Sequence, residues 1–540
     1  MKRTTRIRAA VGALTAAVAL GPAVAAPASA APPHDPTVKV PAVDWKPCPD
    51  LAEVDCGSVT VPIDWSKPYG ETVDIALARQ KATDPAARIG SILINPGGPG
   101  GSGVDWAKGG PIFSPEVHRR FDVVGFDPRG VGGSHPVLCD LDIEVESVPP
   151  VPRDRAEFDA VVAHNKALGD SCRKLTGPLF DFVDTASVTR DMDAIRAALG
   201  EHKLNYYGVS YGTLMGQQYA ELFPRRIRTM VIDSNMDHSL RTTWQFLQTE
   251  ATAAQENFDQ FITWCGRTAA CALHGQDVRK VFGDLYARAG RGELTFPGSD
   301  IKIEQFQLLS FTNGSFYGPS WQFLADFLKE LSTGQPNPAI DQRAAAVLAG
   351  SRTAGSRIGD RRAGHGEPVP DPFSAVFCQD WRLPVHDFVE LEAYRRALTL
   401  VAPDMKLSPL GWGATTSCLG WPARVRNPQH RLEVASAPPI LMLNSRYDPA
   451  TPYQWATNAS RQMGAALLTY DGWGHGSYFK GSSCVTGAVD TYFLTGATPN
   501  RGTHCPAVEP PTEAQLRTQS PTRPRWPLTD TPTWTTPHQP

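Results

Sequence analysis

The chain has 540 residues, enough for several domains or for one large α/β core that carries an inserted domain. Its 52 Lys and Arg residues nearly balance its 55 Asp and Glu residues, which leaves a formal net charge of −3. Proteins that bind nucleic acid or anionic membranes usually carry a basic excess. The composition therefore argues against nucleic acid as a partner and leaves the oligomeric state open.

The first 30 residues have the layout of a secretory signal. Four basic residues precede an apolar stretch at residues 9–20, and Ala28-Ser29-Ala30 supplies an A-x-A cleavage site. The alternative is a retained membrane anchor, but a spanning helix needs about 20 apolar residues and this stretch is shorter. We expect residues 1–30 to be removed, residues 31–41 to form a Pro-rich leader or short pro-segment, and the mature chain to be extracellular, without a membrane partner.

Ten cysteines in an exported chain predict five disulfides. Ten cysteines permit about 945 pairings, so their number does not determine the connectivity. A metal site is less favoured, because there is no C-x-x-C pair and no clustered Cys and His spacing. The simplest hypothesis pairs sequential neighbours: Cys48 with Cys56, Cys139 with Cys172, Cys265 with Cys271, Cys378 with Cys418, and Cys484 with Cys505.

Strand patterns begin soon after the leader. Residues 58–63 and 72–78 alternate with period two and predict an antiparallel hairpin. Later strands are short and continuously apolar, and helical patterns such as residues 188–199 separate them. Buried parallel strands that alternate with helices indicate an α/β fold whose mostly parallel sheet is covered on both faces. These later strands are expected at residues 91–95, 122–126, 204–209, 229–232, 439–444 and 466–470.

The alternation of strands and helices stops between residues 236 and 430, where helical, aromatic-rich pieces predict a large, mainly helical cap inserted in the core. The core is then expected in two parts, at residues 42–235 and 431–506. Residues 507–540 are rich in Pro and Thr and predict a disordered or extended tail.

Residues Gly208-Val209-Ser210-Tyr211-Gly212 match the G-x-S-x-G nucleophile elbow of serine hydrolases. An apolar strand pattern precedes this motif and a helix pattern follows it, which is the setting that the elbow requires. Small residues two positions before and after the serine are needed to avoid collisions in the strained turn. Ser210 is therefore the predicted nucleophile, and the α/β-hydrolase fold is the predicted fold.

A serine hydroxyl needs a base within hydrogen-bond reach and a carboxylate that orients the base. In α/β hydrolases these partners follow the serine in the order acid and then histidine, each after a later strand. Asp448 and His475 occur in this order after the two strands expected beyond the cap. Asp233 is the rival acid, since it also ends a strand, but it precedes the cap.

The segment 95–103, Asn-Pro-Gly-Gly-Pro-Gly-Gly-Ser-Gly, directly follows a strand and offers backbone N–H groups for a developing oxyanion. A phosphate-binding loop is the alternative, but the P-loop spacing with Lys is absent. We expect the oxyanion donors to be the amides of Tyr211 and Gly98, with Gly97 as the rival of Gly98, and the bond between Gly98 and Pro99 is a candidate for the cis form.

Taken together, segments 95–103, 125–134 (Gly-Phe-Asp-Pro-Arg-Gly-Val-Gly-Gly-Ser), 208–212, 448–452 and 474–476 resemble the secreted tripeptidyl aminopeptidases of actinobacteria. These are α/β-hydrolase serine peptidases related to prolyl aminopeptidases. The resemblance covers about residues 42 to 505. Asn95 stands where related prolyl aminopeptidases usually have His, so strict proline preference is not implied.

The resemblance implies a serine aminopeptidase that acts on peptide or protein N-termini, releases tripeptides and needs no metal or organic cofactor. Such an enzyme must hold the substrate ammonium group with carboxylates. Asp380, in a segment that resembles a cap motif of the family, is the candidate ligand, and Tyr317 and Trp321 are either pocket or core residues. An esterase or lipase with the same elbow is the alternative, and a catalytically silent binding protein is a weaker one.

Overall fold

The computed structural model of the protein describes residues 41–146, 148–298, 300–336 and 368–510. The expected signal segment, the leader up to residue 40 and the tail beyond residue 510 lie outside the described residues. Within the described ranges, no helix has both the length and the apolar character needed to cross a membrane.

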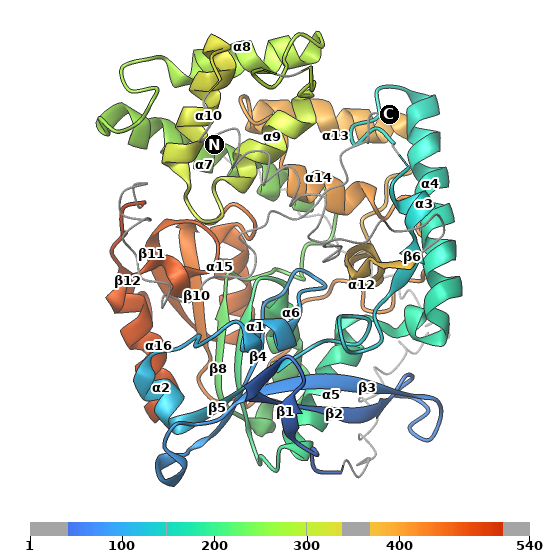
Figure 1. Cartoon of the computed structure of the whole chain (residues 1–540), viewed down its shortest axis with the longest axis vertical. Coiled ribbons are helices and arrows are strands. Elements are labelled where there is room, and N and C mark those ends of the chain that lie inside the picture. The colour runs from blue at the N-terminus through green and yellow to red at the C-terminus, as the bar shows by residue number, and fades with distance from the viewer. Residues whose placement is uncertain (1–40, 147, 299, 337–367, 511–540) are drawn as a thin grey trace, which may run out of the picture. The chain divides into compact units, whose positions relative to one another are not determined.

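The main sheet has ten strands in the described part of the chain, in the order β1-β2-β3-β5-β4-β7-β8-β10-β11-β12 (Figure 1). The strands from β1 to β5 in this order pair antiparallel, and those from β5 to β12 pair parallel. The strands are β1 (Lys46–Cys48), β2 (Leu51–Pro62), β3 (Thr72–Gln80), β4 (Gly90–Asn95), β5 (Phe121–Phe126), β7 (Leu204–Val209), β8 (Ile227–Asp233), β10 (Leu441–Tyr447), β11 (Ala466–Trp473) and β12 (His504–Cys505).

Helices cover both faces of this sheet. Neighbouring strand residues point to opposite sides, so they pack against different sets of helices. Tyr207 packs in a buried cluster with residues of α1 (Gly103–Lys108), α2 (Pro115–Arg120) and α16 (Ser483–Thr495). Its neighbour Tyr206 packs in another cluster with residues of α5 (Thr185–Ala198), α6 (Tyr211–Leu222) and α15 (Tyr453–Met463). The strands are therefore buried on both sides, as their continuous apolar character predicted.

Between β8 and β10 the described residues are mainly helical. A third apolar cluster joins side chains of several of these helices, and Trp473 at the end of β11 also belongs to it. The helices are α7 (Thr243–Arg267), α8 (Val278–Gly290), α9 (Gln305–Gly314), α10 (Trp321–Thr333), α12 (Pro372–Asp380), α13 (Phe388–Val401) and α14 (Pro409–Thr416). They form the cap, and the residue boundaries expected for it remain a prediction.

Some elements were not expected from the sequence. The long helix α4 (Arg155–Thr176) precedes the cap, and its Phe158 packs in the cap cluster. The strand β6 (Leu138–Asp140) pairs antiparallel with β9 (Pro368–Pro370) in a separate sheet, and the short helix α3 (Leu141–Glu144) follows β6. The two paired strands are far apart in the sequence, and no local sequence pattern predicts that they pair.

The observed architecture confirms the predicted fold class. It is an α/β-hydrolase fold with a mostly parallel sheet, helices on both faces and a large helical cap. All ten cysteines form disulfides between sequential neighbours, as the simplest hypothesis proposed.

Candidate active site

Ser210 lies at the sharp turn between β7 and α6. Its backbone has φ 56° and ψ −125°, a conformation that is strained for a residue with a side chain. A β-carbon on Gly208 would come within 2.5 Å of the Gly212 carbonyl oxygen, and one on Gly212 within 2.8 Å of the Asn95 carbonyl oxygen. The two glycines are thus required by the turn, and the Ser210 amide secures it by donating to the Asp233 carbonyl at 3.0 Å.

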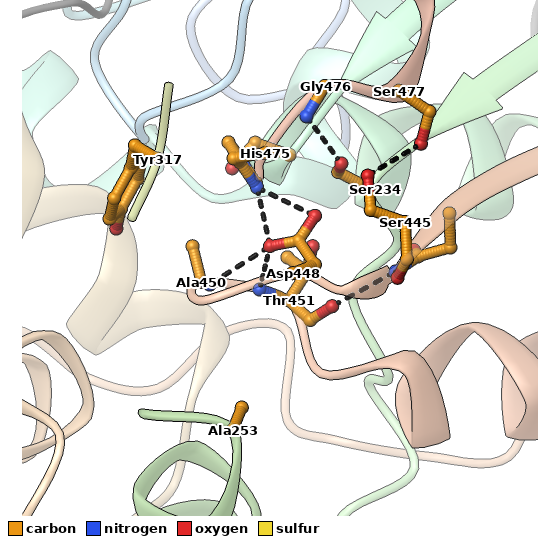
Figure 2. A network of polar contacts seen from close by, with 12 residues as sticks. Ser234, Ala253, Tyr317, Ser445, Asp448, Ala450, Thr451, His475, Gly476 and Ser477 are labelled. Atoms are coloured by element: carbon orange, nitrogen blue, oxygen red, sulfur yellow. Dashed lines mark hydrogen bonds and ion pairs between the residues drawn. The ribbon is translucent and has the colours of Figure 1, made fainter. Parts of the chain in front are cut away.

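His475 and Asp448 are brought together at the ends of β11 and β10. The Nδ1 atom of His475 lies 2.9 and 3.0 Å from the two carboxylate oxygens of Asp448 (Figure 2). Both side chains are buried. Because a carboxylate only accepts, Nδ1 carries the proton in the neutral ring and Nε2 is the acceptor nitrogen. This is the tautomer that a general base for Ser210 needs.

The surroundings of Asp448 favour its ionised form. Burial raises the pKa of this carboxyl, but the charge and hydrogen bond of His475, the Ser234 hydroxyl and the Thr451 amide together lower it below its usual value. The amides of Ala450 and Thr451 both donate to Oδ1 at 2.9 Å. Asp448 therefore stays charged at neutral pH and stabilises an imidazolium on His475.

Asp233, the rival acid, has a different position. Its carboxylate accepts the amides of Ser477 and Tyr478 at 2.9 Å and the hydroxyl of Tyr207 at 3.1 Å. Next to it, the Ser234 hydroxyl accepts the Gly476 amide at 2.8 Å. Asp233 and Ser234 thus hold the loop that follows His475. From the sequence, Asp233 was considered only as a rival acid, and this role was not predicted.

The glycine-rich loop after β4 lies against the elbow. A β-carbon on Gly97 would come within 2.7 Å of the Tyr211 amide nitrogen. The Gly97 amide itself donates to Asn95 Oδ1 at 2.9 Å, so it is not available to an oxyanion. Among the described residues no acceptor binds the amides of Gly98 or Tyr211. This geometry favours Gly98 over Gly97 as the second donor, and the bond between Gly98 and Pro99 is cis.

Tyr317 of the cap lies beside the His475 side chain. The two rings are 5.3 Å apart in an edge-on arrangement. The Tyr317 carbonyl accepts the His475 amide at 2.8 Å and Lys480 Nζ at 2.9 Å. Trp321, by contrast, is a buried core residue that packs against Trp473. Of the two aromatic candidates, Tyr317 is therefore the one that borders the site.

Comparisons with known proteins agree with this geometry. Residues 409–505 match the family model described as TAP-like protein. The serine protease Hip1 of Mycobacterium tuberculosis is 33% identical over 497 residues, which cover 86% of this chain and 91% of that protein. A tripeptidyl aminopeptidase of Streptomyces coelicolor is 31% identical over 493 residues, 86% of each chain.

The chain belongs to the tripeptidyl aminopeptidase family. It is a serine hydrolase with the α/β-hydrolase fold. A carboxylesterase B of Mycobacterium tuberculosis is also 32% identical over 489 residues, 87% of this chain and 91% of that protein. Relatives of this chain within the family thus carry both peptidase and esterase names.

Asp380, the expected ligand of a substrate ammonium group, has no acceptor position left for it. Its Oδ1 accepts the Thr185 amide and the Asn427 side chain, both at 2.8 Å. Its Oδ2 accepts the Thr185 hydroxyl at 2.6 Å and the Tyr211 hydroxyl at 2.7 Å. A carboxylate offers about four acceptor positions, and all are used. The structure thus argues against the role that the cap motif suggested for Asp380.

Glu250 on α7 is a buried carboxyl that the sequence did not single out. Its Oε2 accepts the Ser408 hydroxyl at 2.9 Å, and no donor to Oε1 is found in the described ranges. Burial raises its pKa well above the usual value, the Ser408 hydrogen bond lowers it, and the charge of nearby Asp448 raises it. Ala253 follows one turn later on the same helix face, and Figure 2 shows it apart from the polar network around Asp448.

Proposed function

We propose that this protein is a secreted serine aminopeptidase that cleaves near a free N-terminus and releases tripeptides through an acyl-enzyme. Ser210 is the nucleophile, His475 the general base and acid, and Asp448 the orienting carboxylate. The amides of Gly98 and Tyr211 are the oxyanion donors. The observation that carries the proposal is the hydrogen-bonded His475 and Asp448 pair at the same sheet edge as the strained Ser210 turn.

In the first half of the reaction, Ser210 Oγ attacks the scissile carbonyl carbon while His475 Nε2 takes the hydroxyl proton. The carbonyl oxygen becomes an oxyanion, which accepts hydrogen bonds from the two amides. The carbon–nitrogen bond then breaks, and the proton on Nε2 passes to the leaving amine. In the second half, water gives a proton to His475 and attacks the acyl carbon, so the peptide leaves as an acid and Ser210 regains its proton.

Recognition of a free N-terminus requires a carboxylate near the nucleophile that is not already saturated. Glu250 is close enough to Asp448 for their charges to interact, and it is less saturated than Asp380, because one donor binds Glu250 and four bind Asp380. An ammonium group beside Glu250 would favour its ionised form and offset the cost of its burial. We therefore place the ammonium subsite at Glu250, and the name of the Streptomyces coelicolor relative supports the aminopeptidase activity.

The second candidate is an esterase, which the carboxylesterase relative favours. Three substrates that share the residue at the cleaved bond separate the two functions: a tripeptide amide with a free N-terminus, its N-acetylated form, and an ester of the N-acetylated single residue. We expect the free tripeptide amide to be turned over with the highest kcat/KM and Ser210→Ala to abolish its turnover. A preference for either acetylated compound would overturn the aminopeptidase proposal.

The extracellular location is supported by the five disulfides, which persist in oxidising compartments. Expression with the native N-terminus and sequencing of the protein in the culture medium tests this part. A mature N-terminus at or after Ala31 is expected, and full-length protein retained in cells would contradict it.

A further inference from the structure

Helix α12 of the cap contacts both sides of the proposed oxyanion hole. At its start, Pro372 packs against the glycine-rich loop, where a β-carbon on Gly100 would come within 2.6 Å of Pro372 Cγ. At its end, Asp380 accepts the Tyr211 hydroxyl. Between them, the Phe377 ring lies 6.3 Å from the Tyr211 ring. One cap helix therefore contacts the two segments that supply the oxyanion donors.

The Tyr211 amide has little support from its own helix. Tyr211 is the first residue of α6, and the first amides of a helix have no carbonyl partner within it. The preceding Ser210 is strained, so the backbone at this point needs restraint from elsewhere. The Tyr211 side chain supplies a tether, because it is 1% exposed and its hydroxyl binds Asp380.

Asp380 is a rigid end for this tether. It is fully buried, and its other donors come from Thr185 at the start of α5 and from Asn427 beyond α14. The disulfide between Cys378 and Cys418 links α12 to the segment after α14 as well. Movement of the Asp380 carboxylate would break hydrogen bonds to three separate parts of the chain.

We propose that Asp380 is a positioning residue that holds the Tyr211 backbone amide in line with the oxyanion through the Tyr211 side chain. The proposal rests on the proposed serine peptidase function. Oxyanion donors act in the transition state and not in the ground state, and misplacement by about 1 Å can cost about 100-fold in rate. Loss of the tether therefore lowers kcat and leaves KM nearly unchanged.

The chain offers a matched control for this effect. Tyr219 lies on the same helix, is fully buried, and its hydroxyl binds the Asp193 carboxylate at 3.0 Å. Tyr211→Phe and Tyr219→Phe each remove one buried tyrosine–aspartate hydrogen bond, so they are expected to lower the melting temperature by similar amounts. Only Tyr211→Phe removes the tether at the elbow.

The experiment measures kcat and KM for a free tripeptide p-nitroanilide, with active sites counted by labelling to completion with a fluorophosphonate. We expect kcat of Tyr211→Phe to be about 10-fold below that of Tyr219→Phe, with KM within twofold. Affinity for a tripeptide boronic acid, a transition-state analogue, should fall by a similar factor. Asp380→Asn keeps the shape and one acceptor oxygen, and its kcat should also fall below that of Tyr219→Phe.

Equal kcat values for Tyr211→Phe, Asp380→Asn and Tyr219→Phe would overturn the positioning role. If one of the first two variants does not fold, the other decides the question against Tyr219→Phe. Failure of the proposed function has a different signature, because the wild-type protein itself would then fail to hydrolyse the tripeptide substrate or to label at Ser210.

Discussion

Replacement of Asp448 by Asn tests the role of the charge that orients His475. The substitution keeps the volume, and the amides of Ala450 and Thr451 still need an acceptor at the position of Oδ1. The Asn oxygen therefore occupies that position, and the new NH₂ group replaces Oδ2, which lies 3.0 Å from His475 Nδ1. An NH₂ group donates, so it favours the ring with its proton on Nε2. This ring cannot accept the Ser210 proton.

The expected loss in kcat is about 10⁴-fold, which corresponds to about 5.5 kcal/mol of transition-state stabilisation. The assay is kcat for a free tripeptide p-nitroanilide per folded molecule, with folding checked by thermal unfolding. Asp233→Asn is the control, because that carboxylate binds the loop amides of Ser477 and Tyr478 and not the His475 ring. It should lower stability and retain at least 10-fold more activity than Asp448→Asn. A loss below about 10-fold in Asp448→Asn, or an equal loss in both, would refute the assignment of the acid.

Three further results are expected. Glu250→Gln should raise KM for the free tripeptide substrate about 10-fold or more and leave the weak turnover of the acetylated form unchanged, because only the free form carries an ammonium group. Equal effects on both substrates would contradict the assignment of Glu250 to the ammonium subsite. Replacing Cys378 and Cys418 together by Ser removes a disulfide between residues 40 positions apart. The free energy of unfolding, measured by denaturant titration, should fall by up to about 4 kcal/mol. An unchanged denaturation midpoint would contradict this. The lowered pKa of Asp448 contributes stability that is present above its ordinary value of 3.8 and is lost as the pH falls through the lower value in the folded protein. The part of the stability difference between wild type and Asp448→Asn that comes from this carboxylate should thus shrink as the pH falls below 3.8. A difference that grows over this acid range would show the opposite sign.

The parts of the structure that local patterns encode were predictable. The parallel strands are continuously apolar, and the elbow at Ser210 combines a motif with a strand and a helix within about 20 residues. Asp448 and His475 were candidates because the fold requires an acid and a histidine after later strands. Their hydrogen bond is a tertiary feature, and only the structure places the two side chains within 2.9 Å.

The remaining site features depend on contacts between distant segments. Asp380 was predicted to bind the substrate because its segment resembles a cap motif. The sequence around a single acidic residue does not reveal its hydrogen-bond partners. In the fold, Thr185, Tyr211 and Asn427 fill its acceptor positions. Glu250 carries no motif, and its only sequence signal is an acidic residue on an otherwise apolar helix face that includes Ala253 and Ala254.

The choice between Gly97 and Gly98 likewise needed the Asn95 side chain, which occupies the Gly97 amide. In the sequence both glycines stand in the same loop and are equally able to approach a substrate. The sequence thus predicted an oxyanion donor in this loop, and the hydrogen bond that the Gly97 amide donates to the Asn95 side chain favours Gly98 for that role.

The most direct test of the proposed function is mass spectrometry of the products that purified protein releases from a defined library of unblocked peptides, with Ser210→Ala as the control. We expect tripeptides from the free N-terminus of each cleaved peptide, much weaker cleavage of the N-acetylated library, and no products from the variant. Internal cuts, equal cleavage of blocked and unblocked peptides, or undiminished product formation by Ser210→Ala would contradict the proposed function.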